Sequence, residues 1–237
     1  MKVALIGYGA MGQLVEELAE AAGDQIGVKL TSNESDQDVD ELGAMLRRHD
    51  VAIDFSVGPI VLKNVEACML AGVPMVEGTT GWKDQERRAK ELVTEHDGAL
   101  VYGANFSIGV NVFYRIVQEA AKLFAGLDQY EAFIEEQHHS RKRDAPSGTA
   151  LQLKKVMAEF IKAEIPIAST RAGQIPGTHR VGFDSAADQI TLTHTARSRA
   201  GFAAGALLAA RWIIGRKGVF EFSDVIDEIL SSSASTT

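Results

Sequence analysis

The chain has 237 residues, of which 46% are hydrophobic and 24% charged, as in an ordinary globular protein. Its 24 basic and 32 acidic residues give a formal net charge of −8, which disfavours a general nucleic-acid binder. No apolar run is long enough to span a bilayer and the first residues suit a strand rather than a signal peptide, so we expect a cytoplasmic protein with no membrane partner.

The chain begins with a short apolar run, residues 3–6, that predicts a buried strand. A G-x-G-x-x-G sequence follows at once and leads into a helical pattern over 12–22. Such glycines can serve only as a turn, but between a strand and a helix they favour a dinucleotide site, with the helix N-terminus facing a pyrophosphate. The predicted cofactor contacts in this loop are Gly7, Tyr8, Gly9, Ala10, Met11 and Gly12.

Strand and helix patterns alternate through the first hundred residues. Strands are predicted at 26–30, 51–55, 73–76 and 99–102, and helices at 59–71 and 83–96. Alternation of this kind predicts an α/β fold with a Rossmann-type, doubly wound parallel sheet. The single cysteine, Cys68, lies at helical spacing from its apolar neighbours, which indicates a buried structural thiol. One cysteine excludes an intrachain disulfide framework and a cysteine-based zinc site, and we expect no metal.

Ligands of such folds bind at the carboxyl ends of the strands, so the loops that follow the strands are candidates for the cofactor site. Ordinary turn chemistry is the alternative, because glycine, serine, threonine and asparagine are common in turns. The candidates after the third, fourth and fifth strands are Phe55, Gly78, Thr79, Thr80, Gly103, Ala104, Asn105 and Phe106.

The end of the second strand bears on the choice between NADH and NADPH. Thr31 and Ser32 can hydrogen-bond a ribose hydroxyl or a phosphate, and residues 29–33 contain neither a carboxylate nor an arginine. We therefore expect the protein to use both cofactors with modest discrimination. Glu34 is the alternative determinant, because a different loop path brings its carboxylate to the ribose and favours NADH.

The segment His138–Thr149 packs two imidazoles, three permanent cations and a Pro-Ser-Gly-Thr helix start into twelve residues. The imidazoles and Lys142 can move protons, the cations can hold carboxylates, and the N–H groups that open the helix form an anion cradle. A solvated charged face or a nucleic-acid patch is the alternative. A predicted strand before this basic loop and an amphipathic helix after it favour an active site for an anionic substrate.

The pattern after Phe106 predicts a second, α+β unit, with a helical face from 110 to 120 and a half-buried strand at 190–195. An alanine-rich helix over 202–214 and a last strand and helix over 219–229 return to the first domain. We expect a dinucleotide-binding domain of residues 1–106 and 202–237, and a substrate-binding and oligomerisation domain of residues 107–201. The small, polar tail 231–237 is expected to be disordered.

Several motifs together resemble the dihydrodipicolinate reductases. They are G-Y-G-A-M-G at 7–12, G-T-T-G-W at 78–82, N-F-S-I-G-V-N at 105–111, E-x-H-H-x-x-K-x-D-A-P-S-G-T-A at 136–150, R-A-G-x-I-P-G-T-H at 171–179 and T-H-x-A-x-S-R-x-x-F-A-x-G-A at 193–206. The resemblance covers nearly the whole chain. It implies NAD(P)H-dependent reduction of the dicarboxylate 4-hydroxy-tetrahydrodipicolinate in diaminopimelate and lysine biosynthesis, by a homotetramer. A glycine loop of this family often carries arginine where this chain has Ala10.

The resemblance also implies roles for single residues. His138 and Lys142 match the proton-transfer pair, and His139, Gly148 and Thr149 match substrate-binding positions. Arg199 is a further candidate for a substrate carboxylate, with an ordinary surface arginine as the alternative. Arg171 and His179 are expected to organise the second domain or a subunit interface, and His194 to be a hydrogen-bonded core histidine. A related amino-acid dehydrogenase and a non-catalytic dinucleotide sensor are alternatives that do not need the basic-loop motif.

Overall fold

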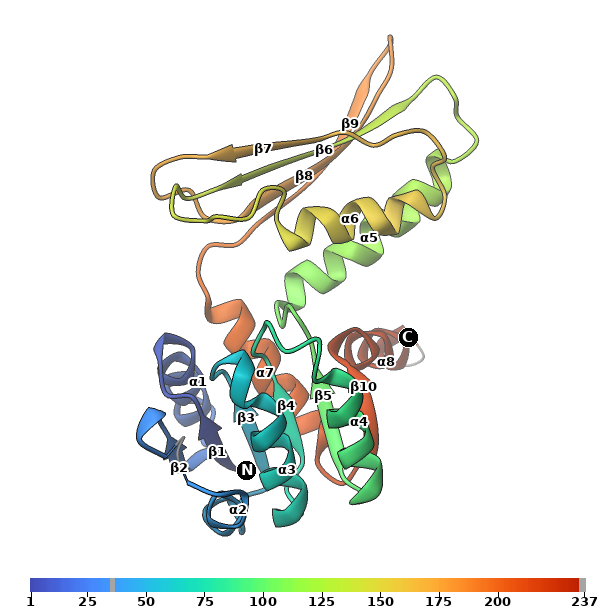
Figure 1. The fold of residues 1–237 in the computed structure, drawn as a ribbon. Coiled ribbons are helices and arrows are strands. Elements are labelled where there is room, and N and C mark those ends of the chain that lie inside the picture. The colour runs from blue at the N-terminus through green and yellow to red at the C-terminus, as the bar shows by residue number, and fades with distance from the viewer. Residues whose placement is uncertain (35–36, 235–237) are drawn as a thin grey trace. The chain divides into compact units, whose positions relative to one another are not determined.

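The computed structural model describes residues 1–34 and 37–234, which form two compact units (Figure 1). One unit joins residues 1–108 to the segment from residue 199 onward, and the other consists of residues 109–198. The second unit is therefore an insertion in the chain of the first.

A parallel sheet forms the centre of the first unit. Its strands are β1 (Lys2–Ile6), β2 (Gln25–Leu30), β3 (Val51–Asp54), β4 (Met75–Glu77), β5 (Ala99–Tyr102) and β10 (Gly218–Glu221). They lie in the order β10-β5-β4-β3-β1-β2, and every neighbouring pair is parallel. Strands β2 and β3 lie on opposite sides of β1, so the sheet reverses its winding there and opens a crevice at the carboxyl ends. The predicted doubly wound sheet is confirmed.

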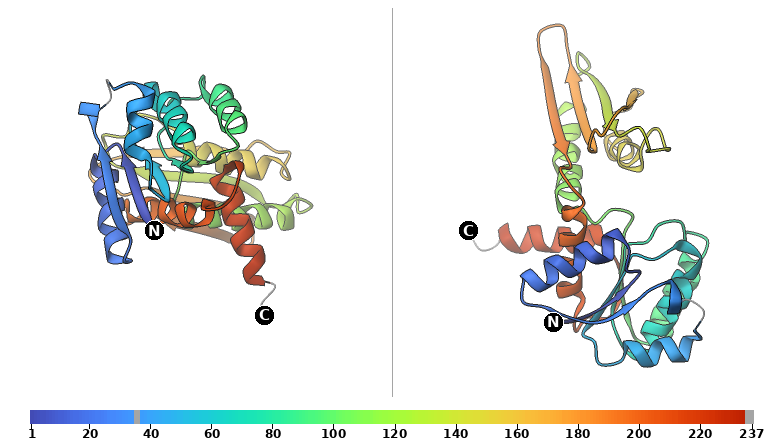
Figure 2. Two further views of the ribbon diagram at one scale, coloured as in Figure 1. Left: turned by 90° about the horizontal axis from the view of Figure 1, so that it is seen from below. Right: turned by 90° about the vertical axis from the view of Figure 1, so that its left-hand side faces the viewer.

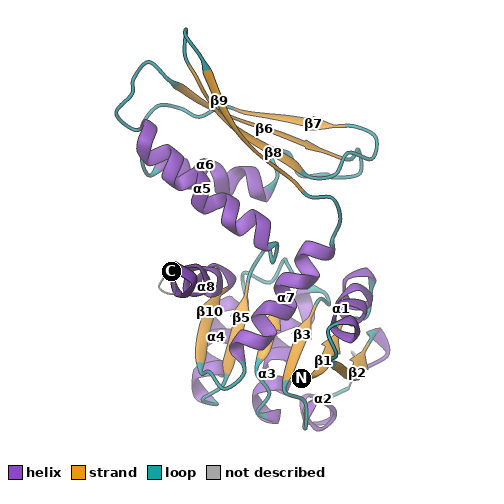
Figure 3. Ribbon diagram, turned by 180° about the vertical axis from the view of Figure 1, so that it is seen from behind, coloured by secondary structure: helices purple, strands orange, loops and turns teal. Residues whose placement is uncertain are grey.

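Helices cover both faces of this sheet (Figures 1 and 3). Helices α1 (Ala10–Ala21) and α7 (Ala200–Ile213) lie together on one face, and α2 (Val39–Leu46), α3 (Val61–Ala71) and α4 (Glu86–Glu95) on the other. Helix α2 is not predicted from the sequence. Its start carries a capping box, because the Asp38 carboxylate accepts the Glu41 N–H at 2.8 Å while the Glu41 carboxylate accepts the Asp38 N–H at 3.3 Å.

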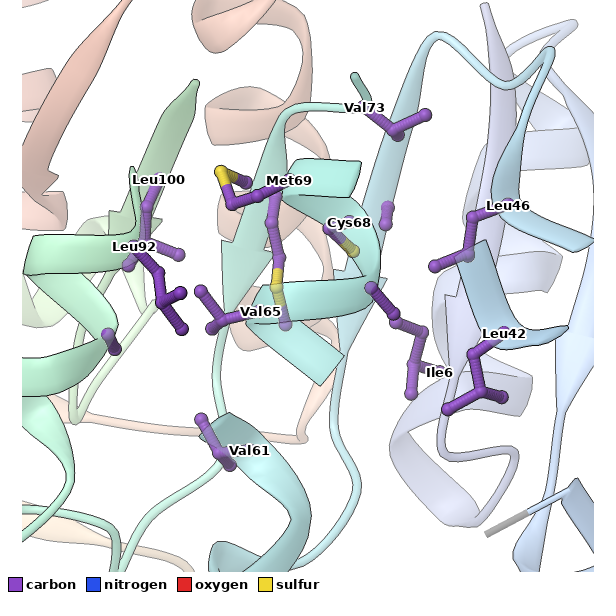
Figure 4. Close-up of a cluster of buried hydrophobic side chains, with 14 of the residues drawn as sticks. Ile6, Leu42, Leu46, Val61, Val65, Cys68, Met69, Val73, Leu92 and Leu100 are labelled. Carbon is purple, nitrogen blue, oxygen red and sulfur yellow. The ribbon is translucent and has the colours of Figure 1, made fainter. Parts of the chain in front are cut away.

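The core between α3 and the sheet is built from one face of the helix (Figure 4). Val61, Val65 and Cys68 follow helical spacing and are fully buried. Burying each valine contributes roughly 1.5–3 kcal/mol relative to an exposed position. The burial of Cys68 confirms the prediction of a structural thiol, and that burial raises the pKa of the thiol well above its usual value, which makes it a poor nucleophile.

The second unit contains a mixed sheet with helices on one face (Figure 2). Strand β6 (Glu131–His138) pairs in parallel with β7 (Ile167–Arg171) and antiparallel with β8 (Thr178–Asp184), and β8 pairs antiparallel with β9 (Gln189–Thr195). Helices α5 (Ile108–Phe124) and α6 (Gly148–Ala158) pack on the face that carries Ile134 and Val181. This confirms the predicted α+β second unit.

The last helix corrects one expectation. Helix α8 (Phe222–Ala234) includes residues 231–234, which the sequence analysis expected to be disordered. The hydroxyl groups of Ser231 and Ser232 donate to carbonyl oxygens of the preceding turn, so these small residues continue the helix. Residues 235–237 of the expected tail lie outside the described residues. No helix in the described part of the chain is long and apolar enough to cross a membrane.

Candidate active site

The glycine loop between β1 and α1 uses its three glycines in different ways. Gly7 has a φ of +82°, and a Cβ there would lie 2.5 Å from the Phe55 carbonyl oxygen. A Cβ on Gly12 would lie 2.4 Å from the Gly7 carbonyl oxygen. Gly9, the N-cap of α1, has no atom within 4 Å of such a Cβ. The loop is thus tightly packed at Gly7 and Gly12 and open at Gly9, where the N–H groups of a helix start can receive a pyrophosphate.

The other predicted cofactor residues lie in loops at the same edge of the sheet, because all the strands that precede them are parallel. Not every side chain is free to meet a ligand. Phe106 is 2% exposed and packs on Phe222, with ring centroids 4.6 Å apart, so its side chain belongs to the core. Tyr8 contacts Glu16, which also forms an ion pair of 2.5 Å with Lys29. A separate pocket beside Val73 and Pro74 lies at the opposite, amino end of the strands.

A carboxylate occupies the end of β2, where the sequence analysis left the outcome open. The Glu34 Oε2 accepts the Thr31 N–H at 2.7 Å and the Thr31 hydroxyl at 2.8 Å. These two bonds lower the pKa of Glu34, so the group is anionic at neutral pH. Thr31 is therefore engaged with Glu34, and a negative charge lies at the strand end that usually recognises the adenosine ribose.

Two buried carboxyl groups support the loops that follow β3 and β4. Asp54 and Glu77 are register partners, and both are 0% exposed. Asp54 accepts the Ser56 N–H at 2.6 Å and the Asn64 amide at 2.7 Å, while Glu77 accepts the Thr79 N–H at 2.6 Å. Burial raises the pKa of both groups, and the Asp54 charge raises that of Glu77 further. The pair therefore retains a proton well above the usual range for carboxyl groups.

We expect Glu77→Gln to stabilise the protein at pH 8 relative to wild type, and to leave their difference small near pH 4. The raised pKa means that the folded chain keeps a proton which the unfolded chain releases above about pH 4.5, so wild-type stability falls as pH rises from there. Each tenfold difference in proton affinity corresponds to about 1.4 kcal/mol. Urea unfolding across this pH range measures the effect, with the exposed Glu221→Gln as control. A variant whose stability follows the wild-type pH dependence contradicts the prediction.

The second unit holds the basic loop. His138 ends β6 and is 8% exposed, and its Nδ1 lies 3.2 Å from Oε2 of the buried Glu136. A Cβ on Gly177 would lie only 3.1 Å from the opposite ring nitrogen, Nε2, so the glycine lets the backbone pack closely against that edge of the ring. Burial lowers the pKa of His138, Glu136 raises it, and Arg171 and Lys142 lower it. The imidazole is thus mainly neutral in the free protein near pH 7.

The remaining predicted substrate residues of this unit belong to the same loop. Lys142 Nζ forms an ion pair of 2.8 Å with Asp144. Gly148 and Thr149 open α6, which Ser147 caps by accepting the Ala150 N–H at 3.3 Å. A Cβ on Gly148 would meet nothing within 4 Å, so a ligand can approach the N–H groups of this helix start. His139 follows β6 directly and is half-buried.

No role is predicted from the sequence for Glu136, and Arg171 and His179 are expected to organise the second domain or a subunit interface rather than to take part in the reaction. The structure brings all three together beside His138, with His179 Nε2 3.7 Å from Glu136 Oε2 and Arg171 Nη2 2.7 Å from Oε1. A polar residue on the helix-covered face of β6 was the available signal. The atoms of Glu136, His138 and His179 that could bind a metal ion lie within 4.8 Å of one another. The positive charge beside this carboxylate is already supplied by Arg171.

The two remaining residues singled out from the sequence, Arg199 and His194, lie at the start of α7 and in β9. Arg199 belongs to the first unit and is the N-cap of α7. His194 is half-buried on β9, with its ring centroid 5.9 Å from that of Phe113. Its buried Nδ1 has no hydrogen-bond partner among the described residues. Aromatic packing, rather than the expected hydrogen bond, accounts for its position.

Comparisons with known proteins identify the family. The family description "Dihydrodipicolinate reductase, N-terminus" matches residues 1–106, and "Dihydrodipicolinate reductase, C-terminus" matches residues 109–226. The chain is 39% identical to the 4-hydroxy-tetrahydrodipicolinate reductase of Christiangramia forsetii, over 98% of this chain and 100% of that protein. It is 34% identical to the enzyme of that name from Archaeoglobus fulgidus, over 96% and 100%.

A solved structure shows the same fold. The dipicolinate-bound dihydrodipicolinate reductase from Paenisporosarcina sp. TG-14 has a TM-score of 0.78 at 21% identity, covering 93% of this chain and 97% of that one. A probable dehydrogenase from Thermotoga maritima is more distant, with a TM-score of 0.58 at 10% identity. Because both halves match the same family and full-length relatives align from end to end, the chain belongs to the dihydrodipicolinate reductase family.

Proposed function

We propose that the protein reduces 4-hydroxy-tetrahydrodipicolinate to tetrahydrodipicolinate, a step of diaminopimelate and lysine biosynthesis. The observation that carries the proposal is the basic loop, where a buried histidine, a lysine and an open helix N-terminus lie within one segment of a chain from this family. The open face of the glycine loop at Gly9 fits a nicotinamide dinucleotide, which supplies the hydride when bound.

The side chains of the basic loop account for binding of a dicarboxylate. Lys142 and His139 hold one carboxylate, and the N–H groups of Gly148 and Thr149 receive the other. In the free protein the Lys142 ammonium group lies 2.8 Å from the Asp144 carboxylate. A substrate carboxylate therefore has to replace Asp144 as the partner of Lys142. Arg199 of the first unit is a further candidate for a carboxylate contact.

His138 and Lys142 handle the proton in this proposal. The 4-hydroxyl group leaves as water, which gives a conjugated imine. Hydride addition to this imine leaves electron density on the ring and its nitrogen, which a nearby cationic acid stabilises and protonates. Lys142 lowers the pKa of His138 in the free protein. The two carboxylates of the bound substrate add negative charge beside His138, so substrate binding raises the pKa of His138 and promotes its protonated, proton-donating form.

A coupled assay tests the function. Freshly generated 4-hydroxy-tetrahydrodipicolinate is added to the purified protein, and oxidation of NADH and of NADPH is followed separately. We expect substrate-dependent oxidation with both cofactors. Absence of turnover with either cofactor, in protein shown to bind the dinucleotide, contradicts the proposal.

We propose that both NADH and NADPH are used and that Glu34 biases the choice toward NADH. Its carboxylate, fixed by Thr31, repels a 2′-phosphate and can accept a ribose hydroxyl. Glu34→Gln is therefore expected to raise the ratio of kcat/KM for NADPH over NADH about tenfold, the change that roughly 1.4 kcal/mol produces. Steady-state kinetics measure the ratio, with the exposed Glu20→Gln at the far end of α1 as control. An unchanged ratio places the determinant elsewhere.

We also propose that residues 1–106 and 202–237 bind the dinucleotide, and that residues 107–201 bind substrate and mediate a homotetramer. The β6–β9 sheet supports the assembly, since its face opposite α5 and α6 has no helix of the described unit over it (Figure 2). That face is mostly polar, with the register pairs Glu135–Arg180 and Arg180–Thr193, and Phe133 lies on it over Gly182. Sedimentation at assay concentrations tests this, and a purely monomeric protein rules it out.

A further inference from the structure

Glu136 is the most highly connected buried charge of the second unit. It lies on β6 two residues before His138, on the same face of the strand, and is 1% exposed. Its Oε1 accepts hydrogen bonds from the Ser169 hydroxyl at 2.7 Å, the Arg171 guanidinium at 2.7 Å and the Ser147 N–H at 3.0 Å. Burial raises the pKa of Glu136, but these bonds outweigh it and lower the pKa to about 2. The group is therefore a fixed anion.

The second oxygen of this carboxylate faces the imidazoles. Oε2 has no hydrogen-bond donor of standard geometry among the described residues, and it lies 3.2 Å from His138 Nδ1 and 3.7 Å from His179 Nε2. An anion at Nδ1 favours the tautomer that carries its proton there. The other nitrogen of His138, Nε2, is then the hydrogen-bond acceptor at the opposite edge of the neutral ring.

The first oxygen connects the same anion to the rest of the basic loop. Ser147, whose N–H it accepts, is the N-cap of α6 and so fixes the helix start that carries Gly148 and Thr149. Arg171 also donates to the Asp144 carbonyl oxygen at 2.6 Å, and the Asp144 side chain pairs with Lys142. One carboxylate therefore holds the histidine, the anion cradle and the segment of the lysine in a single arrangement.

We propose that Glu136 is the positioning residue of this site. It orients His138 with Nδ1 toward the carboxylate and Nε2 toward the substrate, and it sets the proton affinity of the ring. The inference rests on the proposed role of His138 in proton transfer. It makes no use of Glu136 as a group that touches the substrate.

The charges around His138 give this role a signature that packing alone lacks. Glu136 on β6 and Asp144 in the basic loop raise the pKa of His138, whereas Arg171 on β7 and Lys142 in the basic loop lower it. His179 on β8 faces it edge-on, with ring centroids 5.0 Å apart. Removing the negative charge of Glu136 must therefore lower the pKa of His138, and removing the positive charge of Arg171 must raise it.

The test compares Glu136→Gln and Arg171→Gln with Glu119→Gln in the full-length protein. Glu119 is an exposed residue of α5 in the same unit and forms a surface ion pair of 2.6 Å with Lys122, so it is a matched control. NMR titration of the His138 ring in the substrate-free protein measures its proton affinity, and kcat against pH measures the reaction. We expect the midpoint to fall in Glu136→Gln, to rise in Arg171→Gln and to stay unchanged in Glu119→Gln.

We expect kcat of Glu136→Gln to fall tenfold or more, because the imidazole loses its orientation. A tenfold fall corresponds to an activation free energy raised by on the order of 1.4 kcal/mol. A folded Glu136→Gln protein whose His138 titrates at the wild-type midpoint overturns the proposal. If that variant does not fold, Arg171→Gln carries the test, and an unchanged or lowered midpoint there overturns it as well. A shifted midpoint with wild-type kcat supports the contact and instead contradicts the role of His138 in proton transfer.

Discussion

Replacing Lys142 by alanine, or His138 by glutamine, is expected to lower kcat about a hundredfold or more, the usual effect of removing a positioned proton donor. Both groups lie in the basic loop, His138 at the buried end of β6 and Lys142 beside Asp144. The loss should appear in kcat because the proton is needed in the transition state. His139→Ala is expected mainly to raise KM, since that side chain is assigned to carboxylate binding.

The matched controls are Lys155→Ala and His96→Gln, because both side chains are exposed and lie outside the basic loop. Each should keep wild-type kinetics. Steady-state rates with saturating cofactor are measured for all five variants and for wild type, and circular dichroism confirms that each protein is folded. Wild-type turnover in the Lys142 or His138 variant would remove that residue from the proton-transfer step.

Gly9→Val is expected to weaken binding of NADH and NADPH about a hundredfold, on the order of 3 kcal/mol, with little change in Tm. The added side chain enters the space where no protein atom lies within 4 Å, so it obstructs the pyrophosphate rather than the fold. Gly12→Val should behave differently. Its side chain meets the Gly7 carbonyl oxygen at 2.4 Å, so it should lower Tm as well.

Fluorescence titration of the reduced cofactor and thermal melting separate these effects. Gly126→Val is the control, because a Cβ at that position also meets nothing within 4 Å and the residue belongs to the other unit. We expect it to bind both cofactors normally. Wild-type affinity in a folded Gly9→Val protein would show that the dinucleotide does not pass over the start of α1.

Most of the first unit could be predicted from the sequence alone. Its four central strands are short, mainly apolar runs between helical repeats, as parallel strands buried on both faces usually are, so local pattern and tertiary environment agree. The missed elements had weaker patterns. Strand β7 is mostly exposed, β8 contains Gly182 and does not alternate cleanly, and the capping box of α2 at Asp38 and Glu41 was present but not used.

The way in which the polar groups meet depends on the tertiary fold. The basic loop was recognisable because its chemistry is contiguous, from His138 to Thr149. Glu136, Arg171 and His179 come from three strands, and only the pairing of β6 with β7 and β8 brings them to one point. Glu34 likewise needed the turn after β2, which returns its carboxylate to Thr31. Periodicity records which face a residue occupies, whereas hydrogen-bond partners depend on register and loop path, which a single sequence does not encode locally.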